Sequence, residues 1–135
     1  WITLWMSKNI KPGSVCIDGG ANYGYYTFFL ANHGCQVIAI EANPKLIPLL
    51  EKSNEMNGSS DRVTIYNYAL YDKPNQKINM HLLESSLNST IQPQQNTVGA
   101  VEVTTTTIDK ITSKRKSIDF VKLDIEGAEQ MAVKG

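Results

Sequence analysis

The 135-residue sequence lacks a net charge, because 13 Lys and Arg residues balance 13 Asp and Glu residues. A neutral chain has no bulk electrostatic attraction for nucleic acid, so we expect no nucleic-acid partner. The sequence also lacks any apolar run long enough to span a bilayer, which argues against stable membrane insertion. No signal peptide is visible, and we predict a cytoplasmic protein. Because the chain starts on Trp1 and stops on Gly135, we expect a fragment cut at both ends.

Cysteine and histidine are scarce, with two residues of each. Cys16 lies inside one apolar run, and Cys35 just precedes the next. If these runs are neighbouring parallel strands that end level at Asp18 and Glu41, the two thiols are roughly 13 Å apart. That separation is too large for a disulfide, so we predict two reduced, structural thiols. The two histidines have no visible partners, and we predict no metal site.

The sequence contains short apolar runs that alternate with segments typical of helices. The runs predict strands at residues 14–18, 36–41, 62–70 and 118–125, and the segments between them predict helices at 23–32, 43–58 and beyond the last glycine turn. This alternation is typical of an α/β fold with a mostly parallel sheet and right-handed crossovers.

Residues 77–83 and 100–106 have a different pattern, with polar and apolar side chains in strict alternation. Alternation of this kind predicts half-exposed, antiparallel strands. The polar residues 84–99 between them are predicted to form a loop. This loop would cover the substrate side of a binding site. Thr106 and Asp109 resemble a capping box for one short helical turn.

Polar residues stand where four of the predicted runs end, namely Asp18, Glu41, Tyr68 and Asp124. In open parallel sheets, ligands bind beyond the carboxyl ends of the strands, where the strand order reverses. We therefore expect these side chains to lie along one rim and to form a ligand site.

The first glycine turn does not fit a dinucleotide. Its spacing is D-x-G-x-x-x-G, at Asp18, Gly20 and Gly24, rather than G-x-G-x-x-G. A pyrophosphate at this turn would be repelled by the Asp18 carboxylate, whereas an ammonium or sulfonium group would be attracted. S-adenosylmethionine carries both groups, together with a ribose for Glu41. An NAD(P)-dependent oxidoreductase is the alternative that these two observations disfavour.

Four segments, DGGANYGYYT, IEANP, NYAL and VKLDIEGAE, resemble the successive motifs of FkbM-type methyltransferases. These are S-adenosylmethionine-dependent enzymes with the Rossmann-like class I fold, and the resemblance runs from residue 13 to residue 135. It implies a mostly parallel sheet with helices on both faces. Residues 1–135 would form a single partial domain, truncated after the fourth of seven core strands. We expect such a piece to be marginal or inactive alone, because its last strand is an open edge.

The resemblance also assigns roles to residues of the cofactor site. Asp18 would hold the methionine ammonium directly or through water, and Gly20 would let the cofactor lie against the backbone. Asn22 and Tyr23 would open the following helix and line the methionine side. Glu41 would bind both ribose hydroxyls, because its two carboxylate oxygens suit a vicinal diol.

The adenine and acceptor ends follow from the later motifs. Ala69 would contact adenine through its backbone, and Tyr68 replaces an acidic residue found in many relatives. The catalytic candidates are Asp124, which would take a proton from the acceptor or orient it, and Glu126. A different interpretation is that Lys122 pairs with Asp124 or Glu126 in an ion pair without chemistry.

The reaction implied is O-methylation of a hydroxyl on a sugar, glycan or secondary metabolite, with a small molecule or glycan as acceptor. The alternative is a non-catalytic or degenerate Rossmann-like binding domain. Neither the motifs nor the composition predicts the oligomeric state.

Overall fold

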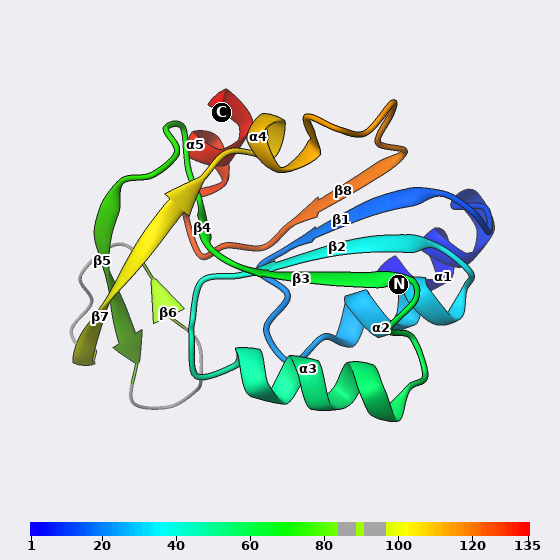
Figure 1. Cartoon of the computed structure of the whole chain (residues 1–135), viewed down its shortest axis with the longest axis horizontal. Helices are drawn as coiled ribbons and strands as arrows, with labels where there is room; N and C mark the ends of the chain where they lie inside the picture. Colours follow the sequence, from blue (N-terminus) through cyan, green and yellow to red (C-terminus); the bar gives the residue numbers. More distant parts are fainter. Residues whose placement is uncertain (84–88, 91–96) are drawn as a thin grey trace.

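The computed structural model describes residues 1–83, 89–90 and 97–135. Its main sheet has four parallel strands in the order β3-β2-β1-β8 (Figure 1). These strands are β1 (Val15–Gly19), β2 (Gln36–Glu41), β3 (Val63–Asn67) and β8 (Phe120–Leu123). The chain moves outward from β1 to β3 and then returns to place β8 on the other side of β1. The strand order therefore reverses between β1 and β8.

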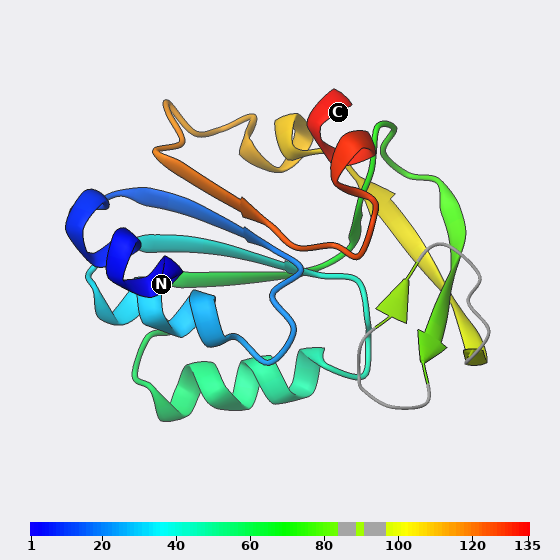
Figure 2. The ribbon, with the colours of Figure 1, turned by 180° about the vertical axis from the view of Figure 1, so that it is seen from behind.

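Helices cover both faces of this sheet, as predicted (Figures 1 and 2). One face carries α1 (Ile2–Asn9), α2 (Tyr25–Asn32) and α3 (Ile47–Met56), and the other carries α4 (Ile108–Thr112) and α5 (Glu129–Lys134). Successive residues of β1 point to opposite faces. Cys16 therefore packs with the core under the first three helices, and Ile17 with the core under the last two. Helix α1 was not predicted from the sequence.

A second sheet lies beyond the carboxyl ends of the main strands, in the order β4-β7-β5-β6. It contains β4 (Ala69–Leu70), β5 (Lys77–Leu83), β6 (Ser89–Thr90) and β7 (Thr97–Thr106). The β5–β7 pair is antiparallel, which confirms the prediction from the alternating pattern. The strand predicted at residues 62–70 is divided at Tyr68, because Ala69 leaves the main sheet and pairs in parallel with Thr105 of β7.

Several further boundaries differ from the prediction. Helix α3 begins at Ile47 rather than at residue 43. Thr107, not Thr106, caps α4, because Thr106 is still in β7 and the Thr107 hydroxyl accepts a hydrogen bond from Lys110 N at 3.1 Å. The last strand ends at Leu123 rather than at residue 125. Within the loop predicted at 84–99, residues 89–90 and 97–99 belong to strands. The rest of that loop prediction, including its role as a cover, falls on 84–88 and 91–96, outside the described residues.

The predicted separation of the two cysteines is wrong. Strands β1 and β2 begin level rather than end level, so Cys16 pairs with Val37 and not with Ala39. Burial, and then the neighbouring Cys35, raises the pKa of Cys16 to about 12. Both cysteines are free and buried, in agreement with the prediction of two structural thiols.

Candidate active site

A cavity of about 460 Å³ opens beyond the carboxyl ends of β1, β2 and β8, where the strand order reverses. Of the eight site residues predicted from the sequence, seven line it and Asp18 does not. The seven are Gly20, Asn22, Tyr23, Glu41, Ala69, Asp124 and Glu126. Residues from four separate motifs are thus brought to one cavity.

The glycine turn after β1 is fixed by its two neighbouring strands. Gly20 N and Ala21 N both donate hydrogen bonds to Ile40 O, at 2.9 and 3.1 Å. Gly20 has a φ of +73°, and a Cβ there would overlap the carbonyl oxygen of Asp124. Glycine is therefore required because the end of β8 approaches closely, a reason that the sequence did not reveal.

The helix after this turn begins later than predicted. Helix α2 starts at Tyr25, with Gly24 in the left-handed conformation at its N-cap. Asn22 also has a positive φ, +52°, which asparagine tolerates better than most residues. Asn22 and Tyr23 therefore precede the helix rather than open it, and both still line the cavity.

Glu41 lies at the end of β2 and is only 6% exposed. Its Oε2 accepts a hydrogen bond from Asn22 N and its Oε1 accepts one from Asn43 N, both at 2.8 Å. Burial raises the pKa of Glu41, and these backbone hydrogen bonds oppose that shift. A carboxylate has about four acceptor positions, so each oxygen retains capacity for one further donor.

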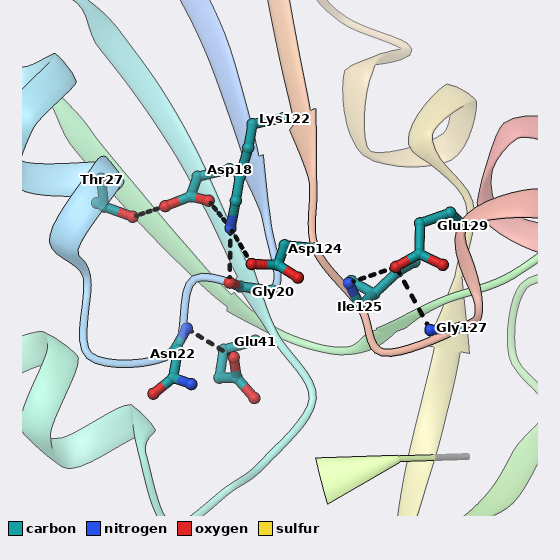
Figure 3. A network of polar contacts seen from close by, with 10 residues as sticks. All are labelled: Asp18, Gly20, Asn22, Thr27, Glu41, Lys122, Asp124, Ile125, Gly127 and Glu129. Carbon is teal, nitrogen blue, oxygen red and sulfur yellow. Dashed lines mark hydrogen bonds and ion pairs between the residues drawn. The ribbon is translucent and has the colours of Figure 1, made fainter. Parts of the chain in front are cut away.

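Asp18 is fully buried beneath the cavity, and a cation already lies next to it (Figure 3). Thr27 Oγ1 donates to Asp18 Oδ2 at 2.6 Å, and Lys122 Nζ lies 3.1 Å from Asp18 Oδ1. Burial raises the pKa of Asp18, and the Lys122 charge opposes the shift. Lys122 lines the cavity, whereas Asp18 does not.

The sequence did not predict this ion pair between Asp18 and Lys122. Lys122 was expected to pair with Asp124 or Glu126, and its Nζ does lie 3.9 Å from Asp124 Oδ2. However, Asp18 is its closer partner, and the two residues are directly opposite in the β1–β8 register. The sequence contained one indication of this pair, namely the position of each residue in its strand. If β1 and β8 are neighbours, Asp18 and Lys122 lie side by side.

The turn after β8 carries both predicted catalytic residues. The Asp124 side chain is 68% exposed, and Glu126 has a φ of +54°. Glu129 at the start of α5 fixes this turn, since its Oε1 accepts hydrogen bonds from Ile125 N at 3.0 Å and Gly127 N at 3.4 Å. Hydrogen bonds from backbone amides, first of all its own, lower the pKa of Glu129.

The far end of the cavity is apolar and is completed by the second sheet. Ala69 and Met80 are buried there in one small cluster, and Tyr68 and Ala42 also line the cavity. Met80 was not predicted as a site residue. The alternation of residues 77–83 placed it on one face of a strand, but not next to a distant cavity.

Two kinds of feature, a metal-binding cluster and a membrane-spanning helix, were sought among the described residues. No three His, Cys, Asp or Glu side chains there gather in an arrangement that could hold a metal ion. No helix in the same ranges is both long enough and apolar enough to cross a bilayer.

Comparison with known families identifies the family of this chain. The model of the methyltransferase FkbM domain matches residues 18–135. The chain belongs to the FkbM methyltransferase family. This membership confirms the family predicted from the four motifs.

Solved structures similar to this FkbM chain share only part of its length. TYW2 of Pyrococcus horikoshii in complex with MeSAdo is 29% identical with a TM-score of 0.48, over 55% of this chain and 28% of that one. An S-adenosyl-L-homocysteine complex of a SAM-dependent methyltransferase from Geobacter sulfurreducens is 21% identical, TM-score 0.48, over 56% and 30%. A similar complex from Thiobacillus denitrificans is 15% identical, TM-score 0.48, over 57% and 32%.

The matched region thus corresponds to less than a third of each of these three chains. No curated protein sequence matches the chain.

Proposed function

We propose that the protein is an O-methyltransferase that methylates a hydroxyl group on a sugar, glycan or secondary metabolite. Residues 1–135 form the cofactor-binding part of its single catalytic domain. The observation that carries this proposal is the exposed carboxylate of Asp124 on the lining of a cavity at the strand-order reversal. When bound, S-adenosylmethionine supplies a methyl carbon that its sulfonium group already activates.

The residues of the cavity suit this cofactor. Glu41 retains acceptor capacity for two ribose hydroxyls, and Gly20 exposes backbone to the cavity. Asn22 and Tyr23 line the methionine side, and Ala69 lies at the apolar adenine end. Three lining carboxylates and an apolar wall favour a cationic, phosphate-free ligand over a dinucleotide.

The charges of the lining also weigh against an oxidoreductase. A pyrophosphate at the glycine turn would approach the carboxylates of Glu41 and Asp124, both of which line the cavity. The Lys122 ammonium, which lines it too, lies within ion-pair distance of both Asp18 and Asp124. Among the described residues, the cavity lining therefore offers a diphosphate no cation without a carboxylate partner.

The acceptor chemistry follows from the turn after β8. Asp124 accepts the proton of the acceptor hydroxyl, or orients that hydroxyl toward the methyl group. Glu126 lines the same side of the cavity and assists in holding the acceptor. The rest of the catalytic contribution is alignment, because an in-line displacement depends on the position of the acceptor oxygen.

The test is transfer of a tritiated methyl group from S-adenosylmethionine by the full-length protein into a panel of sugars, glycans and secondary metabolites. Asp124→Asn should lower turnover by about 100-fold or more, while calorimetry shows little change in cofactor affinity. The control is Asp109→Asn, which alters an exposed carboxylate on α4.

Three results would contradict the proposal. NADH binding without S-adenosylmethionine binding would favour the oxidoreductase. Cofactor binding with no methylation across the whole panel would favour a degenerate binding domain. Undiminished turnover by Asp124→Asn would remove Asp124 from the mechanism.

A further inference from the structure

The Lys122 side chain is a cation that the protein keeps in its interior. It is 9% exposed, and its Nζ lies 3.1 Å from Asp18 Oδ1. The same nitrogen donates a hydrogen bond to Gly20 O at 3.1 Å and lies 5.1 Å from the centre of the Tyr26 ring. One ammonium thus contacts the end of β1 and the glycine turn (Figure 3). It also lies over an aromatic ring of helix α2.

Such a charge is stable in the interior only with its partners. Removing one member of a buried ion pair leaves the other charge uncompensated, which is strongly destabilising. Thr27 Oγ1 donates a hydrogen bond to Asp18 Oδ2, and Lys122 Nζ donates one to Gly20 O. Among the described residues, Asp18 Oδ1 has no hydrogen-bond partner, and the contact that compensates it is the Lys122 ammonium at 3.1 Å. A cation of the protein therefore already lies beside Asp18, in the place that the sequence assigned to the cofactor.

We propose that Lys122 is the positioning residue of the cofactor site and that Asp18 acts on the cofactor only through Lys122. This inference rests on the proposed function, in which the cavity binds S-adenosylmethionine. Lys122 holds the Gly20 carbonyl, and with it the glycine turn, at the end of β8. Asp18 fixes the ammonium in that place and cancels its charge.

The charge balance at the cavity follows from this assignment. The Asp18 carboxylate, which is buried beneath the cavity, and the Lys122 ammonium, which lines it, neutralise each other. The carboxylates that remain for the cofactor and the acceptor are Glu41, Asp124 and Glu126, all on the cavity lining. The attraction for a sulfonium or ammonium group therefore resides in these three residues rather than in Asp18.

The test compares three variants of the full-length protein: Lys122→Met, Asp18→Asn and the double variant with both changes. Calorimetry measures S-adenosylmethionine affinity, and thermal unfolding without ligand measures stability. The control is Lys116→Met, which removes an exposed lysine that precedes β8 and lies outside the ion pair.

We expect Lys122→Met to lower both the melting temperature and the affinity, the latter by about tenfold or more. In the double variant no buried charge is left unpaired, so the melting temperature should recover toward the wild-type value. The affinity should stay low, because no ammonium holds the Gly20 carbonyl. This separation of affinity from stability distinguishes a positioning residue from a purely structural ion pair.

Two outcomes overturn the inference alone: wild-type affinity in Lys122→Met, or affinity that recovers together with stability in the double variant. If Lys122→Met does not fold, the double variant still decides, because its affinity is measured at restored stability. Failure of the wild-type protein to bind S-adenosylmethionine overturns the proposed function, and the inference with it.

Discussion

At the scale of single residues, the three carboxylates at the ends of β1, β2 and β8 differ in their partners. Asp18 is buried against Lys122, Glu41 accepts two backbone N–H groups, and Asp124 is largely exposed. A buried, paired carboxylate loses stabilising free energy when it exchanges partners. Of the three carboxylates, Asp124 is therefore the one suited to a transient proton transfer. The three carboxylates thus differ in burial and in hydrogen bonding, and the roles proposed for them differ accordingly.

Glu41→Gln tests the ribose role. An amide has one oxygen and one NH₂ group, so it cannot accept from Asn22 N and Asn43 N and also from two hydroxyls. We expect S-adenosylmethionine affinity, measured by calorimetry, to fall by about tenfold or more. Glu51→Gln, at an exposed position on α3, is the control and should bind normally. Equal affinity for Glu41→Gln and wild-type protein would refute the assignment.

At the scale of elements, the turns that follow β1 and β8 support each other. Asp124 N donates to Gly19 O at 3.0 Å, and Lys122 Nζ donates to Gly20 O. The first turn can approach the second only because position 20 lacks a side chain. The cofactor side and the acceptor side of the cavity are therefore mechanically one unit.

Gly20→Ala should disrupt this unit. The positive φ and the overlap with the Asp124 carbonyl both oppose a Cβ, so we expect a loss of more than about 2 kcal/mol in the free energy of unfolding. Gly99→Ala is the matched control, since a Cβ there has no atom within 4 Å. Denaturant unfolding measures both variants, and equal stabilities would show that the close approach is not required.

Glu129 gives the second turn a dependence on pH. Its pKa is lowered in the folded protein, so its contribution to stability is present above the unfolded-state pKa and is lost as pH falls through the folded-state pKa. We expect Glu129→Gln to cost about 1 kcal/mol near neutral pH. The difference from wild type should shrink in acid, as followed by thermal unfolding. A pH-independent difference for Glu129→Gln would contradict the assignment.

At the scale of the whole molecule, two sheets enclose one cavity. The main sheet supplies Glu41 and Asp124, and the second sheet supplies the apolar wall at Ala69 and Met80. In the described part of the chain, β8 pairs on one side only, with β1. Its residue Val121 is 41% exposed, so this strand presents an apolar edge.

An apolar edge strand promotes pairing between molecules. We therefore expect the 135-residue chain to self-associate, and Val121→Lys to reduce that association in sedimentation velocity. Val133→Lys is the control, because Val133 is exposed on α5, away from any strand edge. Unchanged association of Val121→Lys would show that the edge of β8 does not mediate it.

The sequence by itself determined the features that depend on neighbouring residues. Apolar runs and helix-like segments predicted the parallel sheet, alternation predicted the β5–β7 pair, and the four motifs predicted the family. Glu41, Tyr68 and Asp124 were placed on one rim because parallel strands carry their carboxyl ends to the same edge, and all three line the cavity. These are properties of local periodicity and of strand direction, which a sequence expresses directly.

The tertiary structure alone decided which distant residues meet. Lys122 and Asp18 are 104 positions apart in the chain, and their pairing depends on β8 lying next to β1. The requirement for glycine at position 20, the division of a strand at Tyr68 and the place of Met80 on the cavity likewise depend on contacts between separate elements. The physical reason is that burial, charge compensation and steric overlap are set by neighbours in space, and neighbours in space are fixed only when the sheets have assembled.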